Sequence, residues 1–369
     1  MENRLPVALN GEKCYEILFE TSFEALPGEL LKMYDSSRKL CIITDSNVSV
    51  LYADEVSRLL SESFDNVSVF EFPAGEESKN LTTVTAVYRF LVENSFNRRD
   101  VIIALGGGVC GDLSGFAAAT YMRGIDFIQI PVSLLSMVDS SIGGKTGVDL
   151  DSYKNMVGAF YMPRLVYINI STLSSLPDRQ FSSGMAEVLK AGLIKDGEFY
   201  EWLINNFNEI MDMDPEALTK MIYESVNIKR LVVEEDPYEK GERAKLNFGH
   251  TLGHAIEKYY DFRLTHGECV ALGSIASAFI SYKRGDLSTE EFYEIRDMFV
   301  PFGLPISFPD EIPDINKIIA LTGSDKKNDE KGLKFILLNK PGSCVIVRDV
   351  TDGEMKEALS ELVVNEEEC

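Results

Sequence analysis

The chain has 369 residues, 45% of them apolar and 26% charged, which favours a globular protein of about two domains and excludes a disordered chain, a collagen-like fibre or a small disulfide scaffold. Its 36 basic and 59 acidic residues leave a formal net charge of −23. This balance argues against nucleic acid or an anionic membrane as a partner, because both require a basic surface. An anionic small molecule is a compatible substrate if basic side chains gather at one place.

The six cysteines are scattered along the chain, and none belongs to a CxxC pair. This usage is typical of free thiols in a reducing compartment. The N-terminal segment has no basic start followed by an apolar run, and no stretch reaches about 18 apolar residues without a charge. We therefore expect a soluble, cytoplasmic protein without a signal peptide or a transmembrane helix.

The first half of the chain alternates β-rich runs with helical patterns. Helical periodicity covers 48–63, about 80–94, and a segment that runs from a glycine turn to Ala119. This alternation predicts parallel βαβ units in a nucleotide-binding type of sheet. Its strands are expected at 14–20, 39–45, 67–72, 101–107, 127–131 and 165–170.

After Leu176-Pro177 the pattern becomes mainly helical. Only 334–340 and 344–350 are typical of strands in this half. We therefore expect an α/β nucleotide-binding domain over 1–177 and a mostly α-helical domain over 178–369. Helices are expected at 180–195, 197–212, 215–235, 246–260, 268–284, 288–300 and 352–363, the last opened by a capping box at 351–354.

The segment ALGGGVCGD (104–112) follows a predicted strand and opens a helix. Its consecutive glycines let the backbone approach a ligand closely, and the helix N-terminus offers free N–H groups that suit a pyrophosphate. The GxGxxG fingerprint is absent, so a tight strand-to-helix turn is the alternative. Residues at the ends of two earlier strands favour the binding site, namely Asp45 and Asn47 after one and Gly75, Glu76 and Lys79 after the other.

All three histidines of the chain fall in one short segment, at His250, His254 and His266. The first two are spaced i, i+4 on a predicted helix and share a face, and His266 is expected in a turn with Gly267. Imidazoles gathered with a carboxylate would form an open site for a divalent metal. Structural histidines are the alternative, and Thr251 after His250 excludes the HExxH metalloprotease motif.

The carboxylate of such a site could come from Glu187. Glu187 and Lys190 are spaced i, i+3 on a predicted helix and point the same way. An ordinary surface ion pair is the alternative for these two residues.

Small residues dominate DSSIGGKTGVD (139–149), which YKNMVGAF (153–160) follows. We expect these segments to form a loop that carries Asp139, Lys145, Lys154 and Asn155. A lysine in a glycine-rich loop suits a phosphate as a mobile point charge. The spacing is not that of a P-loop, and a flexible surface loop is the alternative.

An ordered set of motifs extends over about 40–345, and through it the chain resembles the 3-dehydroquinate synthase family of sugar-phosphate cyclases. The resemblance implies an enzyme that uses NAD and one divalent metal, zinc or cobalt, to convert 3-deoxy-D-arabino-heptulosonate 7-phosphate to 3-dehydroquinate and phosphate. The implied steps are oxidation at C5 by NAD, β-elimination of phosphate, re-reduction and intramolecular aldol closure, so that NAD is regenerated. The motifs are GEESK, ALGGGVCGDLSGFAAATYMRG, DSSIGGKTGV, KNMVGAFYMP, GMAEVLK, LNFGHTLGHAIE and HGECVA.

The resemblance also implies a role for individual residues. The metal would be bound by Glu187, His250 and His266, and protons would be transferred by His254 and Glu239. Arg123 matches an arginine that the neighbouring subunit supplies, which implies a homodimer. Substrate hydroxyls would contact Asp139, Asn155 and Lys190, the carboxylate Lys229 and Arg243, and the phosphate Lys145, Asn247, His254 and Lys326. Cofactor contacts are implied for Asp45, Asn47, Gly75, Glu76, Lys79, Gly107, Gly108, Val109, Asp112, Ser133, Leu135, Lys145, Lys154, Thr172, Leu173, Ser174 and Ser175.

Three positions depart from the family pattern. Val132 stands where the family has threonine, Tyr153 where it has glycine, and Asp149 where asparagine is common. These changes concern cofactor affinity and loop detail, not the class of reaction. Lys327 beside Lys326 leaves open which lysine contacts the phosphate.

Three other functions fit parts of this pattern. A metal-dependent polyol or alcohol dehydrogenase has a related two-domain fold but would consume NAD. Another sugar-phosphate cyclase would act on a substrate without a carboxylate, against which Lys229 and Arg243 argue. A non-catalytic NAD-binding protein would close its metal site with four protein ligands, whereas three are offered here.

Overall fold

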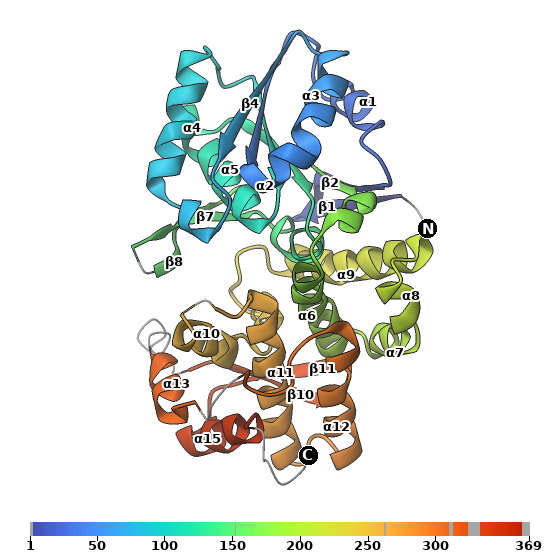
Figure 1. Cartoon of the computed structure of the whole chain (residues 1–369), viewed down its shortest axis with the longest axis vertical. Coiled ribbons are helices and arrows are strands. Elements are labelled where there is room, and N and C mark those ends of the chain that lie inside the picture. The colour runs from blue at the N-terminus through green and yellow to red at the C-terminus, as the bar shows by residue number, and fades with distance from the viewer. Residues whose placement is uncertain (1–2, 152, 262, 310–312, 324–332, 364–369) are drawn as a thin grey trace. The chain divides into compact units, whose positions relative to one another are not determined.

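A computed structural model describes residues 3–151, 153–261, 263–309, 313–323 and 333–363 (Figure 1). Its contacts divide the chain into two compact units, Met1–Leu176 with Lys229–Pro237, and Pro177–Ile228 with Tyr238–Cys369. The sequence assigned 229–237 to the second domain, but this segment groups with the first unit. Contacts of this segment with the first unit include the ion pair of Lys229 with Asp139 and a hydrogen bond of 2.7 Å from the Ala8 N–H to the Glu234 carboxylate.

The first unit is built on a seven-stranded sheet in the order β1-β2-β9-β6-β5-β3-β4. The first pair is antiparallel and the remaining pairs are parallel, as the alternation of strands and helices predicts. The expected strands are confirmed, and one edge strand that contains Pro6 was not predicted. The strands are β1 (Arg4–Leu9), β2 (Glu12–Glu20), β3 (Lys39–Asp45), β4 (Asn66–Phe72), β5 (Val101–Gly106), β6 (Asp126–Pro131) and β9 (Leu165–Asn169).

Helices cover both faces of this sheet, which confirms the expected α/β class. Ile103 of β5 joins one core with residues of α1 (Leu26–Leu31) and α3 (Asp54–Ser61). Its neighbour Ile102 joins the opposite core with residues of α4 (Leu81–Glu93) and α5 (Gly108–Thr120). Because a strand in such a sheet is buried on both sides, it appears in the sequence as an unbroken apolar run.

The strand order reverses at β3. From β3 the chain passes outward to β4 and then returns to the other side of β3 as β5. The carboxyl ends of β3 and β5 therefore flank a topological switch point, where ligands bind in sheets of this kind. Asp45 ends β3 and Gly106 ends β5, and a Cβ added to Gly106 would lie 3.5 Å from Asp45 Oδ2.

The segment expected to be a glycine-rich loop is an antiparallel hairpin of β7 (Lys145–Leu150) and β8 (Tyr153–Phe160). Gly147 pairs with Gly158, and a Cβ added to Gly158 would overlap the Thr146 carbonyl oxygen. The expectation was wrong from Lys145 on, because Gly147 and Gly158 allow close strand contact and do not mark a loop. It holds for the turn before β7, where Gly143 and Gly144 have φ values of 92° and 64°.

The second unit is mainly helical, as expected, and its central helix α11 (His266–Lys283) packs against α6, α10, α12, α15 and β10 (Figure 1). Helix α13 was not predicted, and the segment 197–212 forms two helices. The structure also confirms the capping box at 351–354. The other elements are α6 (Asp178–Lys195), α7 (Gly197–Asn205), α8 (Phe207–Met211), α9 (Pro215–Glu235, of which Lys229–Glu235 belong to the first unit), α10 (His250–Tyr259), α12 (Thr289–Asp297), α13 (Ile315–Leu321), α15 (Asp352–Glu361), β10 (Phe335–Lys340) and β11 (Ser343–Val347).

The sequence predicts free cysteines and no membrane-spanning helix. Cys14, Cys41, Cys110, Cys269 and Cys344 are free thiols. Among the described helices, none has the length and hydropathy needed to cross a membrane.

At Gly115, helix α5 closely approaches both the hairpin and the sheet: an added Cβ would overlap Thr146 Cγ2 of β7 and lie 3.2 Å from the Phe127 ring of β6. We predict that Gly115→Ala lowers the free energy of unfolding by about 1–3 kcal/mol through overpacking. The matched control is Gly353→Ala in α15, where the nearest atom to the added Cβ is Thr351 Oγ1 at 3.8 Å. There the better helix propensity of alanine raises stability by up to about 1 kcal/mol. Urea unfolding measures both, and a gain in stability for both variants would contradict the packing of α5.

Candidate functional site

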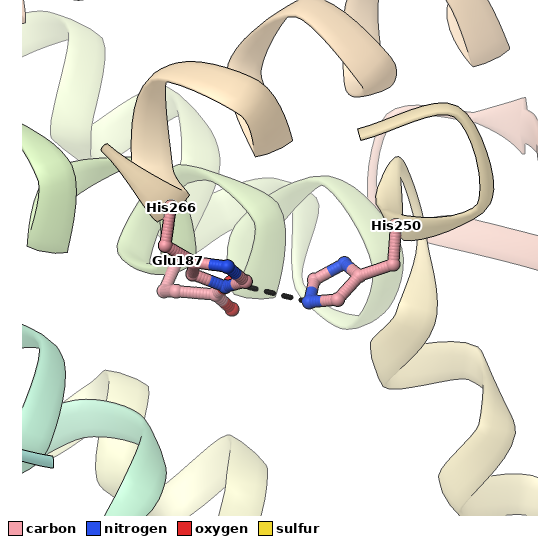
Figure 2. A group of neighbouring side chains, drawn as sticks. All are labelled: Glu187, His250 and His266. Carbon is pink, nitrogen blue, oxygen red and sulfur yellow. Dashed lines mark hydrogen bonds and ion pairs between the residues drawn. The ribbon is translucent and has the colours of Figure 1, made fainter. Parts of the chain in front are cut away.

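Three side chains expected to bind a metal converge in the second unit (Figure 2). Glu187 Oε1 lies 3.5 Å from His250 Nε2 and 3.3 Å from His266 Nε2. The candidate ligand atoms all lie within 4.8 Å of one another. Two imidazoles and one carboxylate are a ligand set that zinc and cobalt accept, and three protein ligands leave a position open for a substrate or water.

The protonation states of Glu187 and His250 suit metal binding, whereas His266 tends to keep a proton that a metal would displace. Burial raises the pKa of the Glu187 carboxyl, but the Lys190 ammonium and His266 outweigh burial and hold it well below its usual value. Burial and the nearby Lys190 hold the pKa of His250 well below its usual value, so this ring is neutral. Burial lowers the pKa of His266, but its hydrogen bond to Glu187 outweighs burial and raises it. Metal binding to an ionised carboxylate and a neutral imidazole releases no proton from either group.

The ion pair between Lys190 and Glu187 is buried. The alternative of an ordinary surface pair, which the spacing left open, is therefore wrong. His250 Nδ1 lies 3.0 Å from the Phe248 carbonyl oxygen. A hydrogen bond donated by Nδ1 leaves the lone pair of Nε2 directed at the cluster, which is the usual arrangement for a histidine that binds a metal.

The start of helix α11 differs from the expectation. His266 is the first residue of this helix and does not lie in a turn before it, because Thr265 and Glu268 form a capping box. This box was not predicted, although its T-x-x-E spacing is a recognisable signal for a helix start. Helix α10 begins only at His250, later than expected, after a 3-10 turn at Glu242–Asn247.

His254 lies one turn after His250 on α10. Its ring centroid is 5.2 Å from that of His250 and 6.1 Å from that of His266. His254 is thus beside the group of candidate ligand atoms and not part of it. The sequence spacing alone left the roles of the three histidines open.

A second cluster surrounds the buried Lys79 in the first unit. Its Nζ lies 2.6 Å from Asp112 Oδ2 and donates a hydrogen bond to Asn155 Oδ1 at 2.6 Å. Glu76 Oε1 lies 3.9 Å from both Lys79 Nζ and Lys154 Nζ. Burial lowers the pKa of Lys79, but Asp112 and Glu76 outweigh burial and raise it above its usual value. The structure therefore brings together five residues that the resemblance assigned to cofactor or substrate, with a charged lysine at their centre.

Helix α5 begins at the glycine turn, near the switch point of the sheet. No described side chain caps its first turn, so N–H groups at the helix start are available to an anion. A Cβ added to Gly107 would lie 3.5 Å from Ser133 Oγ, and one added to Gly108 would lie 3.1 Å from Ser140 Oγ. The turn thus has little room for side chains, and Val109 follows it within the helix. Asp45 Oδ1 accepts hydrogen bonds from the backbone N–H groups of Asn47 and Val48 at 2.9 and 3.2 Å.

Other residues expected to contact the cofactor form hydrogen bonds with neighbouring residues of the first unit. Ser133 Oγ lies 2.9 Å from Ser136 Oγ, and the expected Leu135 lies between these two serines in the chain. Thr172 Oγ1 donates to the Asn169 carbonyl oxygen at 2.8 Å. Thr172 and Leu173 are buried, and the hydroxyls of Ser174 and Ser175 donate to backbone carbonyl oxygens of Ser171 and Thr172. Their contacts with a cofactor, like that of Gly75, stay predictions.

The residues expected to bind substrate fall in both units. In the first unit Asp139 forms an ion pair with Lys229. In the second, Asn247 Nδ2 donates to Glu239 Oε1 at 2.7 Å. Arg243 and Lys229 are buried, whereas Lys145 and Arg123 are exposed. Lys326 and Lys327 lie outside the described residues, so the choice between them stays open.

Comparison with known proteins identifies relatives of the whole chain. The sequence matches the family described as 3-dehydroquinate synthase N-terminal over residues 69–183 and 3-dehydroquinate synthase C-terminal over residues 184–328. The 3-dehydroquinate synthase of Ruminiclostridium cellulolyticum is 41% identical over 352 residues, which are 95% of this chain and 97% of that protein. That of Clostridium botulinum is 44% identical over 335 residues, 90% of this chain and 94% of that protein.

Solved structures share the fold. The structure of 2-deoxy-scyllo-inosose synthase complexed with carbaglucose-6-phosphate, NAD+ and Co2+ has a TM-score of 0.88 at 29% identity and covers 98% of this chain and 100% of its own. ValA, a 2-epi-5-epi-valiolone synthase from Streptomyces hygroscopicus with NAD+ and Zn2+ bound, has a TM-score of 0.87 at 27% identity. The match covers 97% of this chain and 99% of ValA. A butanol dehydrogenase from Thermotoga maritima has a TM-score of 0.68 at 14% identity. The match covers 94% of this chain and 96% of the dehydrogenase, and it shows a likeness of fold alone.

We predict that His250→Ala and His266→Ala each lose bound zinc, whereas His254→Ala retains it. The reason is that two of these imidazoles belong to the group of candidate ligand atoms and the third does not. Atomic absorption after dialysis against a weak chelator measures the zinc retained per chain. An empty site in His254→Ala together with a full site in His266→Ala would overturn the ligand assignment.

Proposed function

Because the chain belongs to the 3-dehydroquinate synthase family, we propose that it converts 3-deoxy-D-arabino-heptulosonate 7-phosphate to 3-dehydroquinate and phosphate, a lyase reaction of the shikimate pathway. The observation that carries the proposal is the convergence of Glu187, His250 and His266 in a chain that matches this family over most of its length. The structures of related cyclases with NAD+ and Co2+ or Zn2+ support the choice of cofactors.

The residues present fit a metal and NAD. Glu187, His250 and His266 would hold one zinc or cobalt ion, because they offer three converging donors. Glu187 is ionised and His250 is neutral, as a metal requires, and His266 would give up a proton to the solvent on binding. NAD would lie at the carboxyl edge of the sheet, with its pyrophosphate at the uncapped start of α5. Bound NAD would supply reversible hydride transfer at C5, and a metal held by Glu187, His250 and His266 would supply stabilisation of negative charge on the C5 oxygen.

The chain's own residues would bind the two anionic ends of the substrate. A protein with a net charge of −23 has to place cations locally to attract such a molecule. Lys229 and Arg243 would hold the carboxylate, for which the planar fork of an arginine is well suited. Lys145, Asn247 and His254 would hold the phosphate, while Asp139, Asn155 and Lys190 contact the hydroxyls.

Proton transfer would use His254 and Glu239. A ketone at C5 acidifies the C–H bond of the adjacent carbon. That proton is removed as the bond to phosphate breaks, and the phosphate leaves with the electron pair while a C=C bond forms. Asn247 donates to Glu239 and would orient that carboxylate for the transfer.

Another sugar-phosphate cyclase activity is the second candidate. It is favoured by the likeness to 2-deoxy-scyllo-inosose synthase and ValA at 29% and 27% identity. The higher identity to 3-dehydroquinate synthases, 41% and 44%, and the expected carboxylate contacts of Lys229 and Arg243 favour the first candidate.

We predict that the purified chain, given the heptulosonate phosphate, zinc and a catalytic amount of NAD, releases phosphate and 3-dehydroquinate in equal amounts. No net NADH accumulates at 340 nm, because the hydride returns to the product. Chelation stops the reaction, and zinc or cobalt restores it. A preference for a heptulose 7-phosphate without a carboxylate would favour the second candidate, and stoichiometric NADH would indicate a dehydrogenase.

We propose that the enzyme works in the cytoplasm as a homodimer in which Arg123 completes the partner's site. Arg123 is exposed, and it and Met122 have φ values of 69° and 49°, a conformation that non-glycine residues adopt at a cost of about 1–3 kcal/mol each. Strain of this kind is common where a side chain has to be presented to a ligand or partner. The Tyr161 hydroxyl donates to the Ile125 carbonyl oxygen at 2.9 Å and supports the end of this turn.

We predict that Arg123→Ala and Lys145→Ala are each inactive, and that a refolded mixture recovers part of the activity. A hybrid dimer contains one site with an intact Lys145 and an intact Arg123 from the other subunit. Each variant refolded alone is the control. A fully active monomer in sedimentation at the assay concentration would contradict the shared site.

A further inference from the structure

The first turn of helix α11 is fixed by a capping box around a candidate metal ligand. The Thr265 N–H donates to Glu268 Oε2 at 2.6 Å, and the Glu268 N–H donates to Thr265 Oγ1 at 3.3 Å. His266 is the first helical residue inside this box. The box therefore determines where the backbone of His266 begins the helix.

A forked ion pair attaches this box to helix α6. Arg179 donates from Nε to Glu268 Oε1 and from a terminal nitrogen to Oε2, both at 2.8 Å. The same terminal nitrogen donates to the Arg263 carbonyl oxygen at 2.9 Å. The side chain of Arg179 is 56% exposed, but that of Glu268 is only 14% exposed. Two parallel charge-assisted bonds to a largely buried carboxylate are stronger and more directional than an ordinary surface pair.

The two helices also touch through their backbones beside the candidate ligands. The Gly267 N–H donates to Ser183 Oγ at 3.0 Å, and a Cβ added to Gly267 would overlap the Ser183 carbonyl oxygen. Ser183 precedes Glu187 by one helical turn on α6 and so lies on the same face. Contacts at Gly267 and Glu268 thus lie on the same short segment as His266 and join it to the helix that carries Glu187.

We propose that Glu268, held by Arg179, is a positioning residue for the metal ligand His266. The pair would keep His266 Nε2 at the short distance from Glu187 Oε1, 3.3 Å, that lets both atoms bind one ion. Glu268 is not itself a ligand here, because its oxygens accept from Arg179 and from the Thr265 N–H. This inference rests on the metal site of the proposed function.

The test changes the pair from both sides. Arg179→Lys keeps the positive charge but loses the fork, and Glu268→Gln keeps a residue that can form the capping box but loses the ionic partner. We expect each variant to bind zinc about tenfold more weakly, the lower end of what loss of a residue behind a metal ligand costs. Competition with a chromophoric chelator measures the affinity of the full-length chain, and the absorption spectrum of the cobalt-loaded protein reports the ligand geometry.

The same unit provides a matched control. At the start of α15, Thr351 and Glu354 form a capping box, and Arg284 Nε donates to Glu354 Oε1 at 2.8 Å. Arg284→Lys and Glu354→Gln therefore make the same chemical changes at a helix start that carries no candidate metal ligand. We expect both pairs of variants to lower the melting temperature of the metal-free protein, and only the first pair to weaken zinc binding and alter the cobalt spectrum.

The outcomes separate this inference from the proposed function. Wild-type zinc affinity and an unchanged cobalt spectrum in Arg179→Lys and Glu268→Gln overturn the inference and leave the proposed function intact. An equal loss of zinc affinity in Arg284→Lys and Glu354→Gln also overturns the inference. The cause would then be a loss of overall protein stability and not a change in the position of His266. If the wild-type chain binds no zinc, both the inference and the proposed metal site are wrong.

Discussion

The ionised carboxylate of Glu187 is the constraint on which the second unit depends. A buried charge costs several kcal/mol unless other groups compensate for it. Here the compensation comes from Lys190 on the same helix and from two imidazoles on α10 and α11. The three helices have to approach closely for these groups to meet. Glycines allow this, since a Cβ added to Gly273 of α11 would overlap the Gly249 carbonyl oxygen just before α10.

The first unit contains a buried positive charge, that of Lys79, which also has to be compensated. Lys79 is compensated by Asp112 and by the amide oxygen of Asn155, and these residues come from a loop, a helix and a hairpin. The hairpin is tied to the same place because Asp149 accepts from the Asn155 N–H at 2.7 Å while its own N–H donates to the Lys79 carbonyl oxygen at 2.8 Å. The negative charge of Asp149 also helps to raise the pKa of Lys79, so an aspartate is accommodated at a position where asparagine is common in the family pattern.

Those parts of the fold that depend on local pattern could be predicted from the sequence. Strand β3 has the predicted bounds, because a strand buried on both faces leaves an unbroken apolar run. Hairpin β7–β8 could not be predicted, because a glycine-rich sequence is also typical of a loop. Its glycines instead allow the two strands to pair closely, a contact that no local pattern shows. The candidate metal ligands were found because so few histidines are present, yet separating His254 from the others required geometry or the family resemblance. The contact of Arg179 with Glu268 joins residues far apart in the chain and leaves no local signal.

The assignment of Lys229–Pro237 to the first unit has a consequence for dividing this protein. The chain passes from one unit to the other at 176–177, at 228–229 and again at 237–238. A gene fragment that ends near residue 177 would omit the helical turn whose Glu234 binds the backbone of β1. The complementary fragment would carry that turn without the strand it belongs to. Neither unit is therefore an uninterrupted stretch of sequence. Exchanging one unit between relatives would require junctions at 228–229 and 237–238 in addition to the one at 176–177.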